Sequence, residues 1–181
     1  MMKYPEYVKI NGEKVKIKTD FKTALKAFEV VNDNSIGDYE RSLAIIYIMY
    51  GYLPPNDQIE AFLNMAIKFL QCGENSDTQA SRERDMDFIE DEKYINASFM
   101  SDYRIDLSKT DMHFWQFCEL ITGLTDKCVL SRVRHIRTCD PNEYAEKDRR
   151  AIQQAKEALA LPIKYTKEEQ QAIDEFEALF I

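Results

Sequence analysis

The stretch from residue 88 to residue 137 most constrains the fold, because its apolar residues return at helical spacing rather than alternating as in a strand. It predicts three helices: residues 84–103, residues 110–122, and a third that begins after Thr125. The second of these carries an apolar stripe so wide and so aromatic that other helices must cover it. We therefore expect this stretch to form the structural core, with these residues at its centre: Phe99, Phe114, Trp115, Phe117, Ile121 and Leu124.

Short polar residues and a glycine mark the ends of these helices. Ser108 or Asp106 can cap the start of the second helix, because a side-chain oxygen satisfies amide groups that the first turn leaves free. Thr125 can cap the third helix in the same way. Gly123 follows the last turn of the second helix, where a left-handed backbone is easiest for a residue without a Cβ.

Two short runs of alternating apolar and polar residues flank Asn11-Gly12 near the N-terminus. A tight turn needs left-handed backbone angles that Asn and Gly tolerate, so residues 7–18 are predicted to form a β-hairpin. The helix predicted at residues 38–50 is apolar almost all round, so we expect it to lie centrally. With it, the periodicity predicts three helices in this part, at residues 21–31, 38–50 and 57–71.

Gly and Pro are scarce, at 5 residues each, which argues against a turn-rich β protein and for long helices. The predicted fold class is mainly α: a multi-helix bundle with a short N-terminal β-hairpin. Two further helices are predicted at residues 142–161 and 167–180, on either side of Pro162. The chain divides into an N-terminal hairpin (1–18), an N-terminal helical part (19–73), a flexible polar loop (74–83), a central helical part (84–162) and a C-terminal acidic amphipathic helix (163–181).

Charge and apolar patterning exclude two classes of partner. The formal net charge of -8 argues against general nucleic-acid binding, which rests on Lys and Arg neutralising phosphates. No apolar run approaches the roughly 18 residues needed to span a bilayer, so no membrane association is expected. The first ten residues lack a long apolar run, so we expect no signal peptide and reduced thiols in a cytosol.

The four cysteines and two histidines raise the alternative of a metal protein or an enzyme. Cys128, His135 and Cys139 are spaced C-x6-H-x3-C, but zinc needs four converging ligands and the chain has no CxxC or HxxxH motif. His113 and Cys118 on one helix would point in different directions, which makes a poor nucleophilic pair. We expect no catalytic residue, no metal and no cofactor.

Acidic residues cluster where the first of the three central helices is predicted to begin. A solvated first turn explains them, because the helix dipole favours negative charge there, and binding of a divalent ion is the alternative. The cluster consists of Asp87, Glu90, Asp91 and Glu92.

Two surfaces are predicted to bind a partner. One is a basic helix in an otherwise acidic chain, which either docks an acidic partner or is an ordinary solvated face paired with acids of the same chain. Its residues are Lys127, Arg132, Arg134 and Arg137. The other is the apolar face of the C-terminal helix, which either folds back on the body or docks on another chain. Its residues are Ile173, Phe176, Leu179 and Phe180.

Two motifs in the central stretch carry a resemblance to a known family. The first is I-x-A-S-F-x-x-x-Y-x-I-D-L, from Ile95 to Leu107, and the second is H-x-W-x-F-x-x-L-x-x-G-L, from His113 to Leu124. They are similar to the bacteriophage gp-fifteen family, small helical proteins of siphophages and prophages of Gram-positive bacteria. The likeness extends over nearly the whole chain to Pro162, with Phe114 where a second Trp is expected.

The resemblance implies a role in tail morphogenesis rather than catalysis. Genes of this family lie in the tail cluster just before the tape-measure gene, where tail assembly chaperones are encoded. A protein of this kind would bind the tape-measure protein, help to recruit tail-tube subunits and self-associate, in the host bacterial cytoplasm during phage assembly. The first alternative is a structural virion component, such as a tail or head-completion subunit. The second is the enzyme or metal protein built on Cys and His.

Overall fold

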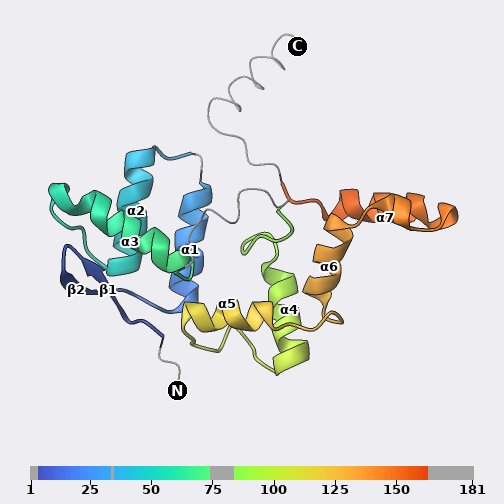
Figure 1. Ribbon diagram of the computed structural model, residues 1–181, viewed down its shortest axis with the longest axis horizontal. Helices are drawn as coiled ribbons and strands as arrows, with labels where there is room; N and C mark the ends of the chain where they lie inside the picture. The colour runs from blue at the N-terminus through green and yellow to red at the C-terminus, as the bar shows by residue number, and fades with distance from the viewer. Residues whose placement is uncertain (1–3, 34, 74–83, 163–181) are drawn as a thin grey trace, which may run out of the picture.

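The computed structural model describes residues 4–33, 35–73 and 84–162 (Figure 1). The fold is mainly α with one N-terminal β-hairpin, which confirms the predicted class. The predicted loop at 74–83 and the C-terminal helix at 163–181 lie outside the described residues. The elements are β1 (Tyr7–Ile10), β2 (Glu13–Lys16), α1 (Phe21–Asn32), α2 (Asp38–Tyr50), η1 (Asn56–Gln58), α3 (Ile59–Leu70), α4 (Glu92–Tyr103), α5 (Phe114–Thr122), α6 (Val129–Thr138), η3 (Pro141–Glu143) and α7 (Glu146–Leu159).

The hairpin forms at the predicted turn. Asn11 and Gly12 have φ angles of 50° and 87°, and the register pairs Ile10 with Glu13 across the turn. Ile10 and Val8 are buried on the face of β1 that contacts α3. An isolated hairpin is only marginally stable, so its packing on α3 is what holds it in place.

Helix α2 is only partly covered. It contacts α1 and α3 and buries Ile46 and Met49 completely. On its other side Tyr39 and Tyr47 are 58% and 59% exposed. The prediction that this helix lies centrally is therefore wrong. Its apolar residues lie all round the helix, but neighbouring helices cover only one side of it.

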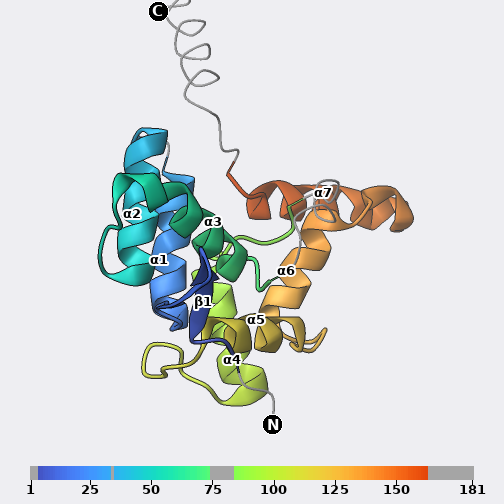
Figure 2. The same ribbon diagram turned by 60° about the vertical axis from the view of Figure 1, so that its left-hand side comes forward.

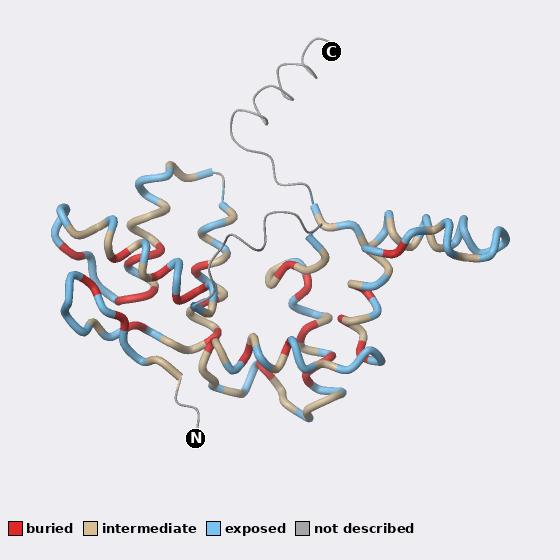
Figure 3. Tube along the Cα trace, viewed as in Figure 1, coloured by how far each residue is buried: buried red, intermediate tan, exposed pale blue. Residues whose placement is uncertain are grey.

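Helix α5 joins two groups of elements (Figure 1). The hairpin and α1 to α3 form one group, and α4, α6 and α7 form the other. On α5, the ring of Phe117 lies 4.9 Å from that of Phe21 on α1 and 5.4 Å from that of Phe99 on α4. Phe99, Phe114 and Phe117 are fully buried, and buried segments of the tube occur in both groups as well as along α5 (Figure 3).

The remaining predicted core residues lie nearer the edge of the same cluster. Ile121 is buried, whereas Trp115 and Leu124 are partly buried and pack against the core. Trp115 donates from Nε1 to the carbonyl oxygen of Phe69 over 2.9 Å. This hydrogen bond ties α5 to the end of α3.

The central helices begin later than predicted. Helix α4 starts at Glu92 instead of residue 84, because the Asp87 carboxylate accepts N–H groups of Ile89 and Glu90 and holds a turn there. Helix α5 starts at Phe114 instead of residue 110. The residues before it run antiparallel to the start of α1, where the Phe114 N–H donates to the Thr19 carbonyl over 2.7 Å.

The caps also differ from those predicted. His113 caps α5, since its Nδ1 accepts the N–H of Trp115. Asp106 instead accepts hydrogen bonds from Ser108, which lower the pKa of Asp106 to about 2. Thr125 donates to Asp102, and Cys128 caps α6.

Gly123 ends α5 for a reason other than its backbone angles. Its φ is -84°, which any residue can adopt. A Cβ at this position would lie 2.9 Å from the hydroxyl oxygen of Tyr103, which donates to the Leu120 carbonyl over 2.9 Å. The prediction of a left-handed residue is therefore wrong, and the glycine makes room for a tyrosine from α4.

Helix α7 projects away from the rest of the chain (Figures 1 and 2). It begins at Glu146, four residues later than predicted, because η3 follows the Asp140 cap and occupies Pro141–Glu143. Helix α7 has no buried residue and contacts α6 and η3. Within the described parts of the chain, no helix is both long enough and apolar enough to cross a membrane.

Candidate functional site

Three of the four basic residues predicted to form a binding surface lie on α6, and Lys127 precedes this helix. Arg134 and Arg137 direct their side chains toward the chain itself. Arg137 donates from Nη1 to Asp91 Oδ2 over 2.6 Å and from Nη2 to Asp91 Oδ1 over 2.8 Å. The side chains of Arg137 and Asp91 are 8% and 0% exposed. The Asp91 carboxylate raises the pKa of Arg137 above its ordinary value. The two residues form a buried bidentate ion pair.

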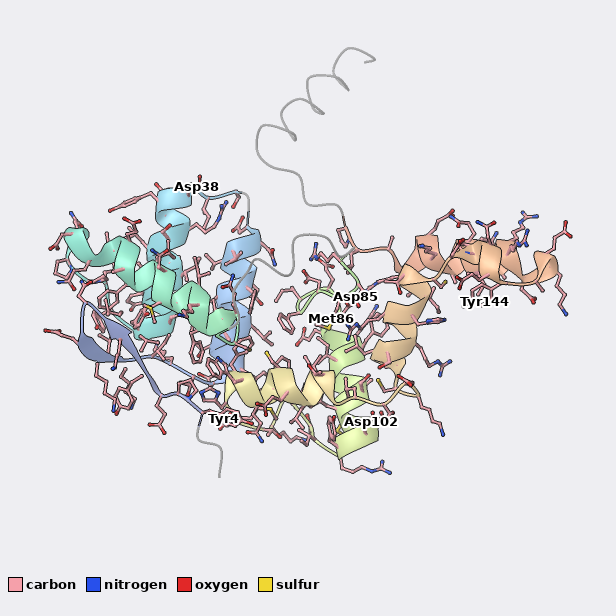
Figure 4. The ribbon with its side chains drawn as sticks, in the orientation of Figure 1. Tyr4, Asp38, Asp85, Met86, Asp102 and Tyr144 are labelled. Atoms are coloured by element: carbon pink, nitrogen blue, oxygen red, sulfur yellow. The ribbon has the colours of Figure 1, made fainter. Side chains whose placement is uncertain are left out.

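The Arg137 guanidinium also joins three segments of the chain. Its Nη1 donates to the Asp85 carbonyl over 3.0 Å, and its Nε donates to the Leu159 carbonyl over 2.6 Å. The segment before α4, the end of α6 and the end of α7 therefore meet at one side chain (Figure 4 labels Asp85 there). A guanidinium engaged in this way has little capacity left for a partner.

The other three basic residues, Arg132 and Arg134 on α6 and Lys127 before it, are more accessible. Arg134 donates from Nε and Nη2 to Asp85 Oδ2, over 3.0 and 2.8 Å, and stays partly exposed. Lys127 and Arg132 are exposed. Partner binding by this helix stays a prediction, and Lys127 and Arg132 are the residues whose position suits it best.

The acidic cluster is divided between the interior and the solvent. Asp91 and Asp87 are buried, at 0% and 8% exposure, whereas Glu90 and Glu92 are exposed. The interpretation as a solvated first helical turn is therefore wrong for the two aspartates. Asp87 pairs with Arg84 and Asp91 with Arg137, so both carboxylates serve the fold.

Helix α2 and the turn after it expose large apolar side chains, which we call the tyrosine face. Its residues are Tyr39, Tyr47, Tyr52 and Leu53, and they are 58%, 59%, 47% and 50% exposed. Tyr39 and Tyr47 are eight residues apart and lie on one side of the helix. Tyrosine is enriched at protein interfaces, since it offers a large apolar body and a polar tip.

The candidate nucleophilic pair is held in other contacts. The Nε2 of His113 lies 3.0 Å from the Pro5 carbonyl oxygen and its Nδ1 accepts the Trp115 N–H, so both ring nitrogens are engaged with the backbone. A hydrogen bond with Cys72, together with burial, raises the pKa of the Cys118 thiol. A thiol with a raised pKa is a poor nucleophile.

The four cysteines form no disulfide bond with one another. They are Cys72, Cys118, Cys128 and Cys139. Across residues 4–33, 35–73 and 84–162, no group of three or more His, Cys, Asp or Glu side chains could hold a metal ion. The apolar C-terminal residues predicted to bind a partner lie outside the described residues: Ile173, Phe176, Leu179 and Phe180.

A protein-family model described as Bacteriophage Gp15 protein matches residues 3–161 of this chain. The chain belongs to this family. The match confirms the resemblance seen in the two central motifs. No curated protein and no solved structure matches the chain.

Membership of the Gp15 family suggests a structural or morphogenetic role in a bacteriophage, and the family is not known as one of enzymes. The motif residues of α4 serve the fold: Ile95 and Phe99 are buried in the core. Ser98, also buried, accepts the N–H of Leu130 and so helps to cap α6. The motifs therefore mark how the central helices pack together.

Two features of the structure were not predicted from the sequence: the burial of Asp91 and the tyrosine face. Asp91 precedes Ile95 and Phe99 by four and eight residues, so it lies on the same buried stripe as these two residues. This spacing is a signal in the sequence from which the burial of Asp91 could have been predicted. The tyrosine face had no such signal, because an exposed and a buried apolar side of one helix look alike in a sequence.

Proposed function

We propose that this protein is a tail assembly chaperone that binds the tape-measure protein in the host bacterial cytoplasm during phage assembly. Family membership supports a role in phage morphogenesis. The observation that carries the binding part of the proposal is the tyrosine face, which leaves aromatic side chains of α2 about half exposed. Exposed apolar surface of this kind marks interaction sites in soluble proteins.

The tyrosine face suits a helical client. An amphipathic helix laid along α2 would place its apolar stripe against Tyr39 and Tyr47, which are two helical turns apart. Tyrosines pack large areas at low entropic cost and often dominate binding energy. A long client offers many such stripes, so many copies would bind it, arranged head to tail by a contact that can propagate. Tail-tube subunits would then be recruited to the coated client.

The test is co-expression with the tape-measure protein, followed by size-exclusion chromatography with light scattering. We expect a soluble complex with many copies of this chain per tape measure. The double variant Tyr39→Ser/Tyr47→Ser should bind at least about tenfold more weakly, since loss of a hot-spot residue costs ~1–2 kcal/mol or more. The matched control is Tyr7→Ser, another exposed tyrosine, on the hairpin.

Two results would count against the proposal. If wild-type protein stays alone beside an insoluble tape measure, the chaperone function is wrong. If the double variant, with wild-type circular dichroism, co-purifies as well as wild type, the client binds elsewhere and the tyrosine face is not the site.

The structural-subunit alternative makes an opposite prediction about mature particles. A chaperone leaves the tail once the tube has formed around the tape measure, whereas a subunit remains. We therefore expect mass spectrometry of purified virions to find the tube protein and not this chain. Detection at a stoichiometry comparable with other tail proteins would favour the structural role.

A further inference from the structure

A cavity of about 290 Å³ opens between α1 and α4, and we call it the α1–α4 groove. Its apolar lining comes from both helices and from the segment before α4, and includes Leu25, Phe88, Ile89 and Ile95. The groove lies apart from the tyrosine face, because none of its lining residues is on α2 or in the turn after it. Apolar clefts of this size commonly hold a few large side chains.

A buried acceptor in this lining has no partner. The side-chain oxygen of Asn96, on α4, is shielded from solvent and accepts no hydrogen bond from any residue that the structure describes. Buried polar atoms are nearly always hydrogen-bonded, and leaving one unpaired is costly. The groove therefore fits an occupant that brings apolar side chains and at least one hydrogen-bond donor.

The described chain ends beside this groove. Arg137 donates to the carbonyl oxygens of both Leu159 and Asp85, so the end of α7 lies next to the segment that continues into the groove wall. Figure 4 labels Asp85 and Met86 in that segment. The described chain therefore ends, at Pro162, near one end of the groove.

The charged residues on the rim of the groove change from acidic to basic with distance from the end of α7. Glu29 and Glu92 lie at the near end, where the rings of Phe28 and Phe88 are 5.1 Å apart. Lys26 and Lys22 lie farther along α1, and Lys22 also forms an ion pair with Asp111 at 3.2 Å. The rim is acidic at the near end and basic at the far end.

Residues 163–181 carry the complementary order. Lys164 and Lys167 come first, and every residue after them that carries a charge is acidic: Glu168, Glu169, Asp174, Glu175 and Glu177. A segment that entered at the near end would place its own lysines beside Glu29 and Glu92 of the rim. Its acidic residues would then lie beside Lys22 and Lys26. Opposed charges that match along a surface set the direction of docking.

We infer that the α1–α4 groove binds the C-terminal segment of the same chain, with the side chains of Ile173, Phe176 and Phe180 in the groove. These three residues share one face of the helix that the sequence predicts. The ten residues from Ile163 to Ala172 reach up to roughly 35 Å when extended, ample for a site near Pro162. Tethering makes the local concentration of the segment high, which favours its own chain over a second copy. The inference does not depend on tape-measure binding.

The test is photo-crosslinking in the full-length protein. Lys26, an exposed residue on the groove rim, is replaced by p-benzoylphenylalanine, and tryptic peptides are identified by mass spectrometry after irradiation. We expect a cross-link to the peptide from Glu168 to Ile181. In an equal mixture of ¹⁴N- and ¹⁵N-labelled protein, the cross-linked products should be unmixed in isotope, because both peptides come from one chain.

Controls separate docking from chance contact. Adding Phe176→Ser should abolish the cross-link, whereas adding Gln171→Ser, off the apolar face, should preserve it. The same photo-reactive residue in place of Tyr47 should give no cross-link to the C-terminal peptide. Absence of the Lys26-position cross-link, or its survival in the Phe176→Ser protein, overturns the inference. Isotopically mixed products would assign the groove to a second copy and overturn the intramolecular form.

Discussion

Replacing Asp91 with alanine is expected to lower the free energy of unfolding by about 3–5 kcal/mol, because Arg137 would keep its charge in a buried position without a counter-charge. The pair is almost inaccessible, at 8% and 0% side-chain exposure. The substitution would also remove the acceptor of the Asp87 N–H. Urea-induced unfolding followed by circular dichroism measures the change, since urea does not screen charges.

Asp85→Ala is the matched control, because it removes a carboxylate from the neighbouring, partly exposed pair with Arg134. Such pairs contribute about 0–1 kcal/mol, so the control should stay close to wild type. The double variant Asp91→Leu/Arg137→Met removes both buried charges and should be more stable than Asp91→Ala. A loss below about 1 kcal/mol in Asp91→Ala would mean that water reaches Arg137, and that the pair is not buried in solution.

Local sequence patterns predicted the elements whose limits are set locally. Asn11-Gly12 supplies the left-handed angles of the hairpin turn without help from the rest of the chain. Helix α2 spans Asp38–Tyr50 as predicted, between glycines at positions 37 and 51. Periodicity is a property of the segment itself, so it identified the existence and type of these elements reliably.

The start of α5 and the role of Thr125 could not be predicted because distant residues determine them. The pairing of Thr19 with Phe114 keeps the residues before α5 extended. Asp102 accepts the Thr125 hydroxyl, which local rules had assigned to a cap. Each of these contacts joins residues more than twenty positions apart, and capping rules consider only the nearest few.

The candidate binding surfaces also depend on residues that are distant in the sequence. A cluster of arginines on one helix was visible in the sequence, but the partner of Arg137 lies on the approach to α4, 46 positions earlier. Which side of α2 is exposed depends on where α1 and α3 lie. The sequence therefore identified the residues of the basic surface but not the tyrosine face, and tertiary packing decides which residues of each surface face solvent.

Replacing Phe117 with alanine is expected to lower the free energy of unfolding by about 3–5 kcal/mol, through lost burial and the cavity left behind. Phe117 is fully buried. Its ring lies 4.9 Å from that of Phe21, 5.4 Å from that of Phe99 and 6.0 Å from that of Phe88. One side chain on α5 thus contacts the helices of both groups, and a cavity there cannot close by moving one group alone.

Hydrogen exchange can show whether Phe117 couples the two groups. Phe62→Ala makes the matched control, since Phe62 is buried but packs with Tyr50 and Tyr52 inside the first group. We expect Phe117→Ala to accelerate amide exchange in both α1 and α4, whereas Phe62→Ala should accelerate it mainly in α2 and α3. If Phe117→Ala accelerates exchange only within α5, the two groups stay packed together without the Phe117 ring. The aromatic contacts across α5 would then not determine how the two groups are arranged.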